Sequence, residues 1–96
     1  MTLSELLRAS RLSLAEQIDL ACDAFEERWR RAAGDLPTIE SALRGFSREF
    51  RAPAFAELLA VELELRRRAG ERPEPIEYAT RFPEFVTVIA GTFAAK

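Results

Sequence analysis

The residue types that most often carry catalysis or bind metals are scarce in this chain of 96 residues. It contains no histidine, its single cysteine is Cys22, and its only lysine is Lys96. Without histidine the chain lacks the commonest general base and the ligand found in most zinc sites. Cys22 has no second cysteine with which to form a disulfide, and it lies among apolar helix positions, which indicates a buried structural thiol.

The carboxylates follow patterns that are typical of solvated helix faces. Glu57 and Glu64 roughly share one face of a predicted helix, but a di-iron bundle would also need Glu-x-x-His motifs. The glycines are dispersed, so the chain has no phosphate-binding loop. A further acidic flank lies beside the first apolar stripe and consists of Asp19, Asp23, Glu26 and Glu27. We therefore predict that the protein is not an enzyme and binds no metal or cofactor.

Two arginine clusters are the remaining candidates for a binding site. One interpretation is that they compensate helix dipoles and pair with nearby acids, namely Glu26, Glu27, Glu62, Glu64 and Glu71. The other is a docking patch for an acidic or phosphorylated protein, because arginine binds phosphate through two parallel hydrogen bonds. Tyr78 joins the candidates as an amphipathic aromatic residue of the kind enriched at interfaces. The candidate partner-binding residues are Arg30, Arg31, Arg66, Arg67, Arg68 and Tyr78.

The charge and hydropathy of the whole chain narrow the choice of partners. Its 14 basic and 16 acidic residues give a net charge of −2, whereas nucleic-acid binders usually carry a basic excess. No apolar run approaches the roughly 18 residues that span a membrane, and the N-terminus lacks the apolar block of a signal peptide. We expect no nucleic-acid partner, no membrane association and a cytoplasmic location.

Apolar periodicity predicts helices along most of the chain. Ser13 and Glu16 have the spacing of a capping box, and the apolar stripe that follows predicts a helix from Leu14 to about Gly34, with Trp29 on its buried side. Further helices are predicted over residues 38–44, 53–69, 76–81 and 84–94. Residues 1–12 form a predicted N-terminal arm, also helical.

One stretch of the sequence is echoed by another. "RRAAGDLPTIESALRGF" begins at Arg30, and "RRAGERPEPIEYATRFPEF" begins at Arg67. Each copy predicts a basic helix end, a glycine in the left-handed conformation, a proline-stiffened turn and a short helix that begins at Ile-Glu. Ile39 and Ile76 should then pack against their respective long helices.

Together these elements predict an all-α fold, a compact bundle of four to five helices over residues 13–96. It would be built from two similar hairpins, about 14–46 and 53–85, followed by a C-terminal helix at about 84–94. Each hairpin joins a long helix to a short one through a Gly-Pro turn, and neither can bury its apolar face alone.

The same residues carry a family resemblance. From about 14 to 93 the chain resembles the segment that precedes the catalytic domain in planctomycete serine/threonine protein kinases. The first half matches at Phe25, Glu26, Trp29, Pro37, Ile39 and Glu40, although Ser41-Ala42 stands where Asp-Tyr is common. The second half matches more specifically, at Leu63, Glu64, Arg67, Arg68, Gly70, Glu71, Pro73, Glu77, Tyr78, Arg81, Phe82 and Pro83.

The resemblance implies a bacterial, non-catalytic module with a regulatory or partner-recognition task beside a signalling kinase. It supplies no catalytic residues, because the kinase motifs would follow Lys96. Two alternatives stay open: a self-associating domain that forms homo-oligomers, and a helix-turn-helix DNA-binding domain, against which the even charge counts.

Overall fold

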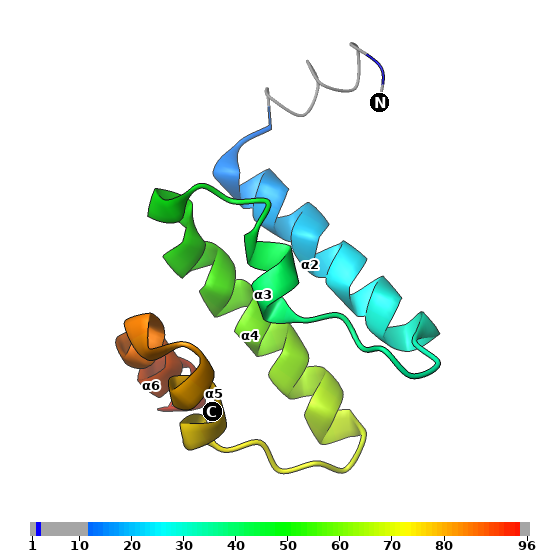
Figure 1. Cartoon of the computed structure of the whole chain (residues 1–96), viewed down its shortest axis with the longest axis vertical. Coiled ribbons are helices and arrows are strands. Elements are labelled where there is room, and N and C mark those ends of the chain that lie inside the picture. The colour runs from blue at the N-terminus through cyan, green and yellow to red at the C-terminus, as the bar shows by residue number, and fades with distance from the viewer. Residues whose placement is uncertain (1, 3–11, 95–96) are drawn as a thin grey trace.

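The computed structural model describes Thr2 and residues 12–94, and these residues form only helices and their connections (Figure 1). The prediction of an all-α bundle of four to five helices is confirmed. The predicted N-terminal arm lies outside the described residues except for Thr2 and Leu12. The elements are α2 (Leu14–Arg31), α3 (Ile39–Leu43), the 3-10 helix η1 (Arg48–Phe50), α4 (Arg51–Arg68), α5 (Pro75–Arg81), the 3-10 helix η2 (Pro83–Phe85) and α6 (Val86–Ala94).

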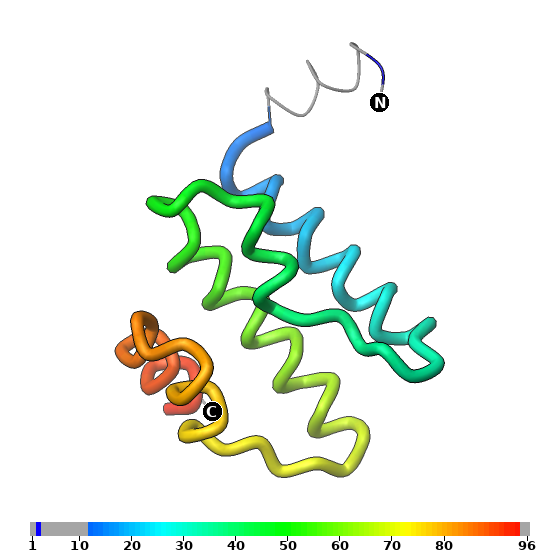
Figure 2. Tube along the Cα trace, in the orientation of Figure 1, coloured from blue at the N-terminus to red at the C-terminus, as the bar shows by residue number. Residues whose placement is uncertain are grey.

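Helix α4 occupies the centre of the bundle. It runs beside α2 and in roughly the same direction, while the short α3, which packs against α4, lies on the segment that leads the chain back to the start of α4 (Figure 2). Helices α5 and α6 pack on the other side of α4. The two arginine-rich helix ends, at Arg31 and Arg68, therefore lie toward the same end of the bundle.

The core is built around the wide apolar surface of α4. Phe55, Leu58 and Leu59 have no exposed surface. The Phe55 ring lies 4.8 Å from that of Phe82 and 4.6 Å from that of Phe85, measured between centroids. Such aromatic contacts each contribute about 0.5–1.5 kcal/mol beyond the burial of apolar area. The other helices add buried side chains to the same core, among them Ile18, Phe25, Ile39, Leu43, Tyr78 and Ile89.

Helix starts follow the predicted capping chemistry. The Ser13 side chain accepts a hydrogen bond from the Glu16 amide, and the Glu16 side chain accepts one from the Ser13 amide, which completes the capping box. The Thr38 hydroxyl accepts from the Ser41 amide at the start of α3. Each bond satisfies an amide that would otherwise lack a partner at a helix start.

The two hairpins differ more than their sequences suggest. Gly70 has a φ of 88°, as predicted, but it is the only described glycine with a positive φ, so the same prediction for Gly34 is wrong. Helix α2 instead ends at Ala32 in extended backbone, before Gly34 is reached.

Their short helices also bury different positions. Ile39 is fully buried, whereas Ile76 is 66% exposed, so the prediction that both isoleucines pack inward is wrong for Ile76. The inward position on α5 is taken by Tyr78, and residues two apart lie on nearly opposite faces of a helix.

We predict that Gly70→Ala lowers the free energy of unfolding by about 1–2 kcal/mol, because an L-residue is strained at positive φ. Space is not the cause, since no atom lies within 4 Å of an added Cβ. The matched control is Gly34→Ala, which should be neutral or up to about 1 kcal/mol stabilising. Urea denaturation measures both, and equal destabilisation of the two variants would contradict the assignment.

Candidate functional site

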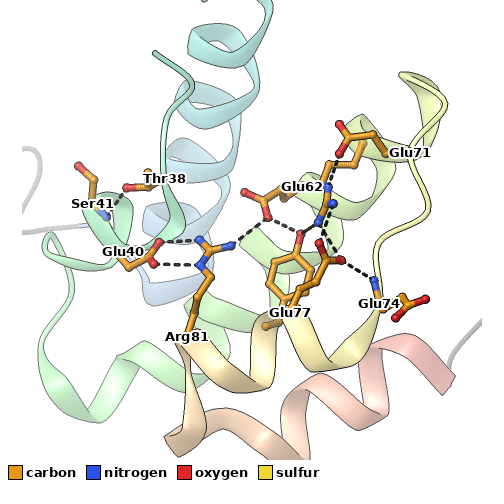
Figure 3. Close-up of polar contacts among 10 residues, drawn as sticks. Thr38, Glu40, Ser41, Glu62, Glu71, Glu74, Glu77 and Arg81 are labelled. Atoms are coloured by element: carbon orange, nitrogen blue, oxygen red, sulfur yellow. Dashed lines mark hydrogen bonds and ion pairs between the residues drawn. The ribbon is translucent and has the colours of Figure 1, made fainter. Parts of the chain in front are cut away.

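Arg66, near the end of α4, joins three parts of the second hairpin. Its Nε donates to Glu71 in the turn at 3.0 Å, and its Nη2 donates to Glu77 on α5 at 3.1 Å. Its Nη1 donates to the Tyr78 hydroxyl at 2.9 Å. Figure 3 shows Glu71 and Glu77 approaching this point from the turn and from α5. With only 17% of its side chain exposed, Arg66 is committed to contacts within the chain.

Beneath Arg66 lies a buried pair, Tyr78 and Glu62. Tyr78 is fully buried and Glu62 is 5% exposed, and the tyrosine hydroxyl donates a hydrogen bond to Glu62 Oε2. Burial raises the pKa of Glu62, an effect that the hydrogen bond from Tyr78 partly opposes. Burial also raises the pKa of Tyr78, so its hydroxyl stays protonated and available as a donor.

A second ion pair connects the two hairpins. Arg81 at the end of α5 donates to both carboxylate oxygens of Glu40 on α3, from Nε at 3.1 Å and from Nη2 at 2.7 Å (Figure 3). Its guanidinium carbon lies 5.4 Å from the Tyr78 ring centroid and 5.0 Å from that of Phe82. The hydrogen bonds from Arg81 lower the pKa of Glu40. The partner of Glu40 therefore comes from the other hairpin, 41 positions along the chain.

These contacts form one structural clamp, which we define as Glu40, Glu62, Arg66, Glu77, Tyr78 and Arg81. Its members bond chiefly to one another, and no buried side-chain nitrogen or oxygen in the described residues lacks a hydrogen-bond partner. The arrangement fastens α5 to α4 and α3. Because the hydrogen-bonding groups of the clamp are already paired with one another, the role that the clamp fits best is to stabilise the fold.

The predicted arginine patch is largely neutralised. Three of its members pair with a glutamate one turn earlier: Arg30 with Glu26 at 2.6 Å, Arg31 with Glu27 at 2.7 Å and Arg68 with Glu64 at 2.6 Å. Arg66 belongs to the clamp, and Arg67 lies over the Phe93 ring at 5.9 Å. Tyr78 is buried in the core, which removes it from any partner surface unless α5 moves. The salt-bridge interpretation of these arginines therefore accounts for most of their contacts.

A different set of arginines lines a surface groove of about 630 Å³. We call it the basic groove; it is lined by Glu40, Leu43, Arg44, Arg48, Arg51, Arg81, Phe82, Glu84 and Phe85. Arg51 is held by a hydrogen bond from its Nε to the Phe46 carbonyl at 3.1 Å. Within the described residues, Arg44 and Arg48 make no side-chain hydrogen bond or ion pair.

Sequence reasoning missed this groove. The segment from Arg44 to Arg51 reads as a polar link between helices, and it holds three arginines against the single Glu49. That local excess of positive charge was the available signal. What the sequence could not show is that α5 and η2 bring Arg81, Phe82 and Phe85 beside the same link.

Comparisons with protein-family models, curated proteins and solved structures gave no match. Among residues 12–94 and Thr2, no group of acidic or cysteine side chains gathers as metal ligands would. None of the described helices combines the length and the apolar character that crossing a membrane requires.

We predict that the Glu62→Gln variant has a larger free energy of unfolding than the parent protein at pH 7. Because the folded-state pKa of Glu62 is raised, the folded protein binds a proton more tightly than the unfolded chain, and the stability contributed by Glu62 falls as pH rises above about 4.5. Gln keeps a hydrogen-bond acceptor for Tyr78 and carries no charge. The gain should therefore vanish near pH 4.5.

The control for this experiment is Glu64→Gln, which changes an exposed residue of the same helix that pairs with Arg68. Urea denaturation from pH 4.5 to pH 7 should show no growing gain for this variant. If Glu62→Gln were instead the less stable protein at pH 7, the ionised carboxylate would be favoured and the inferred direction would be wrong.

Cys22 supplies a second pH prediction. Burial, and then the negative charges of Glu57, Asp19 and Asp23, raise its pKa to about 11. The thiolate is the reactive form, so a disulfide reagent should react slowly with the folded protein at pH 8. In the folded protein the reaction rate should rise as the pH approaches 11. In urea the rate should already rise near pH 9.0, the ordinary pKa of the thiol. Equal pH profiles in the two states would contradict the raised pKa.

Proposed function

We propose that the bundle is a non-catalytic protein-binding module, the N-terminal part of a bacterial serine/threonine signalling kinase that acts in the cytoplasm. Support comes from the residues that carry the resemblance to kinase-associated segments. Gly70 forms the left-handed turn, and Glu71 and Glu77 hold Arg66. Tyr78 and Phe82 fill the core. The pattern therefore specifies a rigid frame, which is what a recognition module needs.

The observation that carries the proposal is the basic groove on that frame. Most charges of the α2 and α4 helix ends are paired within the chain, whereas Arg44 and Arg48 in the groove are not paired with any described residue. Arginine is enriched at protein interfaces, and the guanidinium groups of Arg44 and Arg48 have their hydrogen-bond donors open to a partner. The proposed partner is accordingly a protein, acidic or phosphorylated.

Self-association is the second candidate function, favoured by exposed apolar side chains. Leu20 on α2 is 56% exposed and Ile76 on α5 is 66% exposed. They lie on separate helices, whereas a stable dimer needs one contiguous apolar patch. The molar mass measured by light scattering over a range of concentrations separates the candidates, because a monomer at every concentration would exclude self-association.

The kinase connection is tested on the native gene. We expect the reading frame to continue past Lys96 into a kinase catalytic domain. Deleting residues 13–94 from that protein should leave phosphorylation of a generic peptide intact, while phosphorylation of its physiological protein substrate or its localisation is lost. A reading frame without a kinase domain, or a truncated kinase that behaves as the intact one does, would overturn this part of the proposal.

A further inference from the structure

We propose that the basic groove binds a phosphorylated segment of the partner protein, with the phosphate held by Arg44, Arg48 and Arg51. The inference rests on the proposed function, because it takes the partner to be a protein. It moves the binding site away from the arginines that the sequence singled out and toward the opposite end of α4.

Positive charge gathers in the basic groove. The groove is lined by four arginines and two glutamates on a chain whose net charge is −2, so positive charge is concentrated there against the overall balance. One of the two acids, Glu40, is already bound at both oxygens by Arg81. Among the lining residues, three further guanidinium groups face only one acid, Glu84, and with the neighbouring Glu49 counted as well positive charge still exceeds negative charge, so the groove complements an anion.

The arginines of the groove come from neighbouring segments of the fold. The Nε of Arg51 donates to the Phe46 carbonyl, which fixes the side chain and leaves its two Nη groups without a described partner. Arg48 lies on η1, which leads directly into α4, and Arg44 caps the end of α3. Three guanidinium groups thus come from three neighbouring segments. A phosphate dianion has enough oxygens to accept from all of them, whereas one carboxylate has only two.

Apolar side chains accompany the arginines of the groove. Phe50, between Arg48 and Arg51 in the sequence, is 41% exposed, and Val86, which follows Phe85 of the groove floor, is 51% exposed. Only five large apolar side chains of the described chain are exposed, and two of them follow or precede a groove residue in the sequence, while the apolar lining of the groove itself is Leu43, Phe82 and Phe85. A peptide main chain with an apolar residue near its phosphate matches this surface better than a free phosphate ion does.

The test uses degenerate peptide libraries with a fixed central phosphoserine or phosphothreonine, presented to the whole chain. Matched libraries carry serine, threonine or glutamate at the centre, and phosphatidylserine vesicles are the membrane arm. We expect retention of the phosphorylated libraries, with enrichment of apolar residues beside the phosphate. Arg44→Glu/Arg48→Glu should abolish retention, and the single changes to alanine should each weaken binding of an enriched peptide roughly tenfold.

Arg30→Glu/Arg31→Glu is the matched control, because it reverses two exposed arginines on α2 that pair with glutamates one turn earlier. Its peptide affinity should stay within a factor of about two, well inside the tenfold effect expected in the groove. Circular dichroism verifies that every variant keeps its helices. Arg51→Lys is a second groove variant. It keeps the positive charge but lacks the planar guanidinium that donates two parallel hydrogen bonds, so it should also bind the peptide more weakly.

Each other outcome overturns the inference in a distinct way. Equal retention of the glutamate library would assign the groove to an acidic peptide, and binding to vesicles alone would assign it to a membrane surface. No retention in any arm, or retention that survives Arg44→Glu/Arg48→Glu, would remove the groove as the binding site. The proposed function would stand in that last case if deleting residues 13–94 still disabled the kinase's recognition of its substrate.

Discussion

The hydrogen bond between the buried Tyr78 hydroxyl and Glu62, with Arg66 donating to the same hydroxyl, fixes the second hairpin on the centre of the bundle. Burying a hydroxyl or a carboxyl without a partner costs about 1–3 kcal/mol for each group. If α5 rotated by one position, it would carry Tyr78 away from both α4 residues, and the Tyr78 hydroxyl and the Glu62 carboxyl would lose the hydrogen bond that they share. The clamp therefore selects a single orientation of α5 on α4, whereas the apolar contacts alone would tolerate several orientations.

The positions of the other side chains of the second hairpin follow from this orientation of α5. With Tyr78 inward, Phe82 one turn later also points inward and meets Phe55, and Ile76 is left outside. Arg81 then emerges beside α3 and binds Glu40, which joins the two hairpins through a contact between residues far apart in sequence. The clamp thus sets the floor and one wall of the basic groove, although most of its own members lie outside that groove.

The parts of this fold that could be predicted from the sequence are those decided by neighbouring residues. The capping box at Ser13 and the helix over residues 14–31 rest on short-range chemistry. The left-handed glycine was predicted from a local pattern that held at Gly70 and failed at Gly34. The inward packing of Ile76 was inferred by analogy with Ile39, and it failed because Tyr78 has two polar partners on α4 that the first hairpin does not provide. Similarly, nothing local distinguishes the buried Glu62 from its exposed neighbour Glu64.

The site follows the same division between local and distant contacts. Arg30, Arg31 and Arg68 each pair with a glutamate one helical turn earlier, a contact that sequence spacing predicts. Arg44 has the same relation to Glu40, so spacing alone would neutralise it as well. In the folded protein, however, Arg81 binds Glu40 through a bidentate pair of hydrogen bonds, and such a pair is stronger than an ion pair between flexible surface side chains. Competition from the second hairpin therefore leaves Arg44 without that carboxylate, and the positive charge of the groove becomes a consequence of tertiary structure.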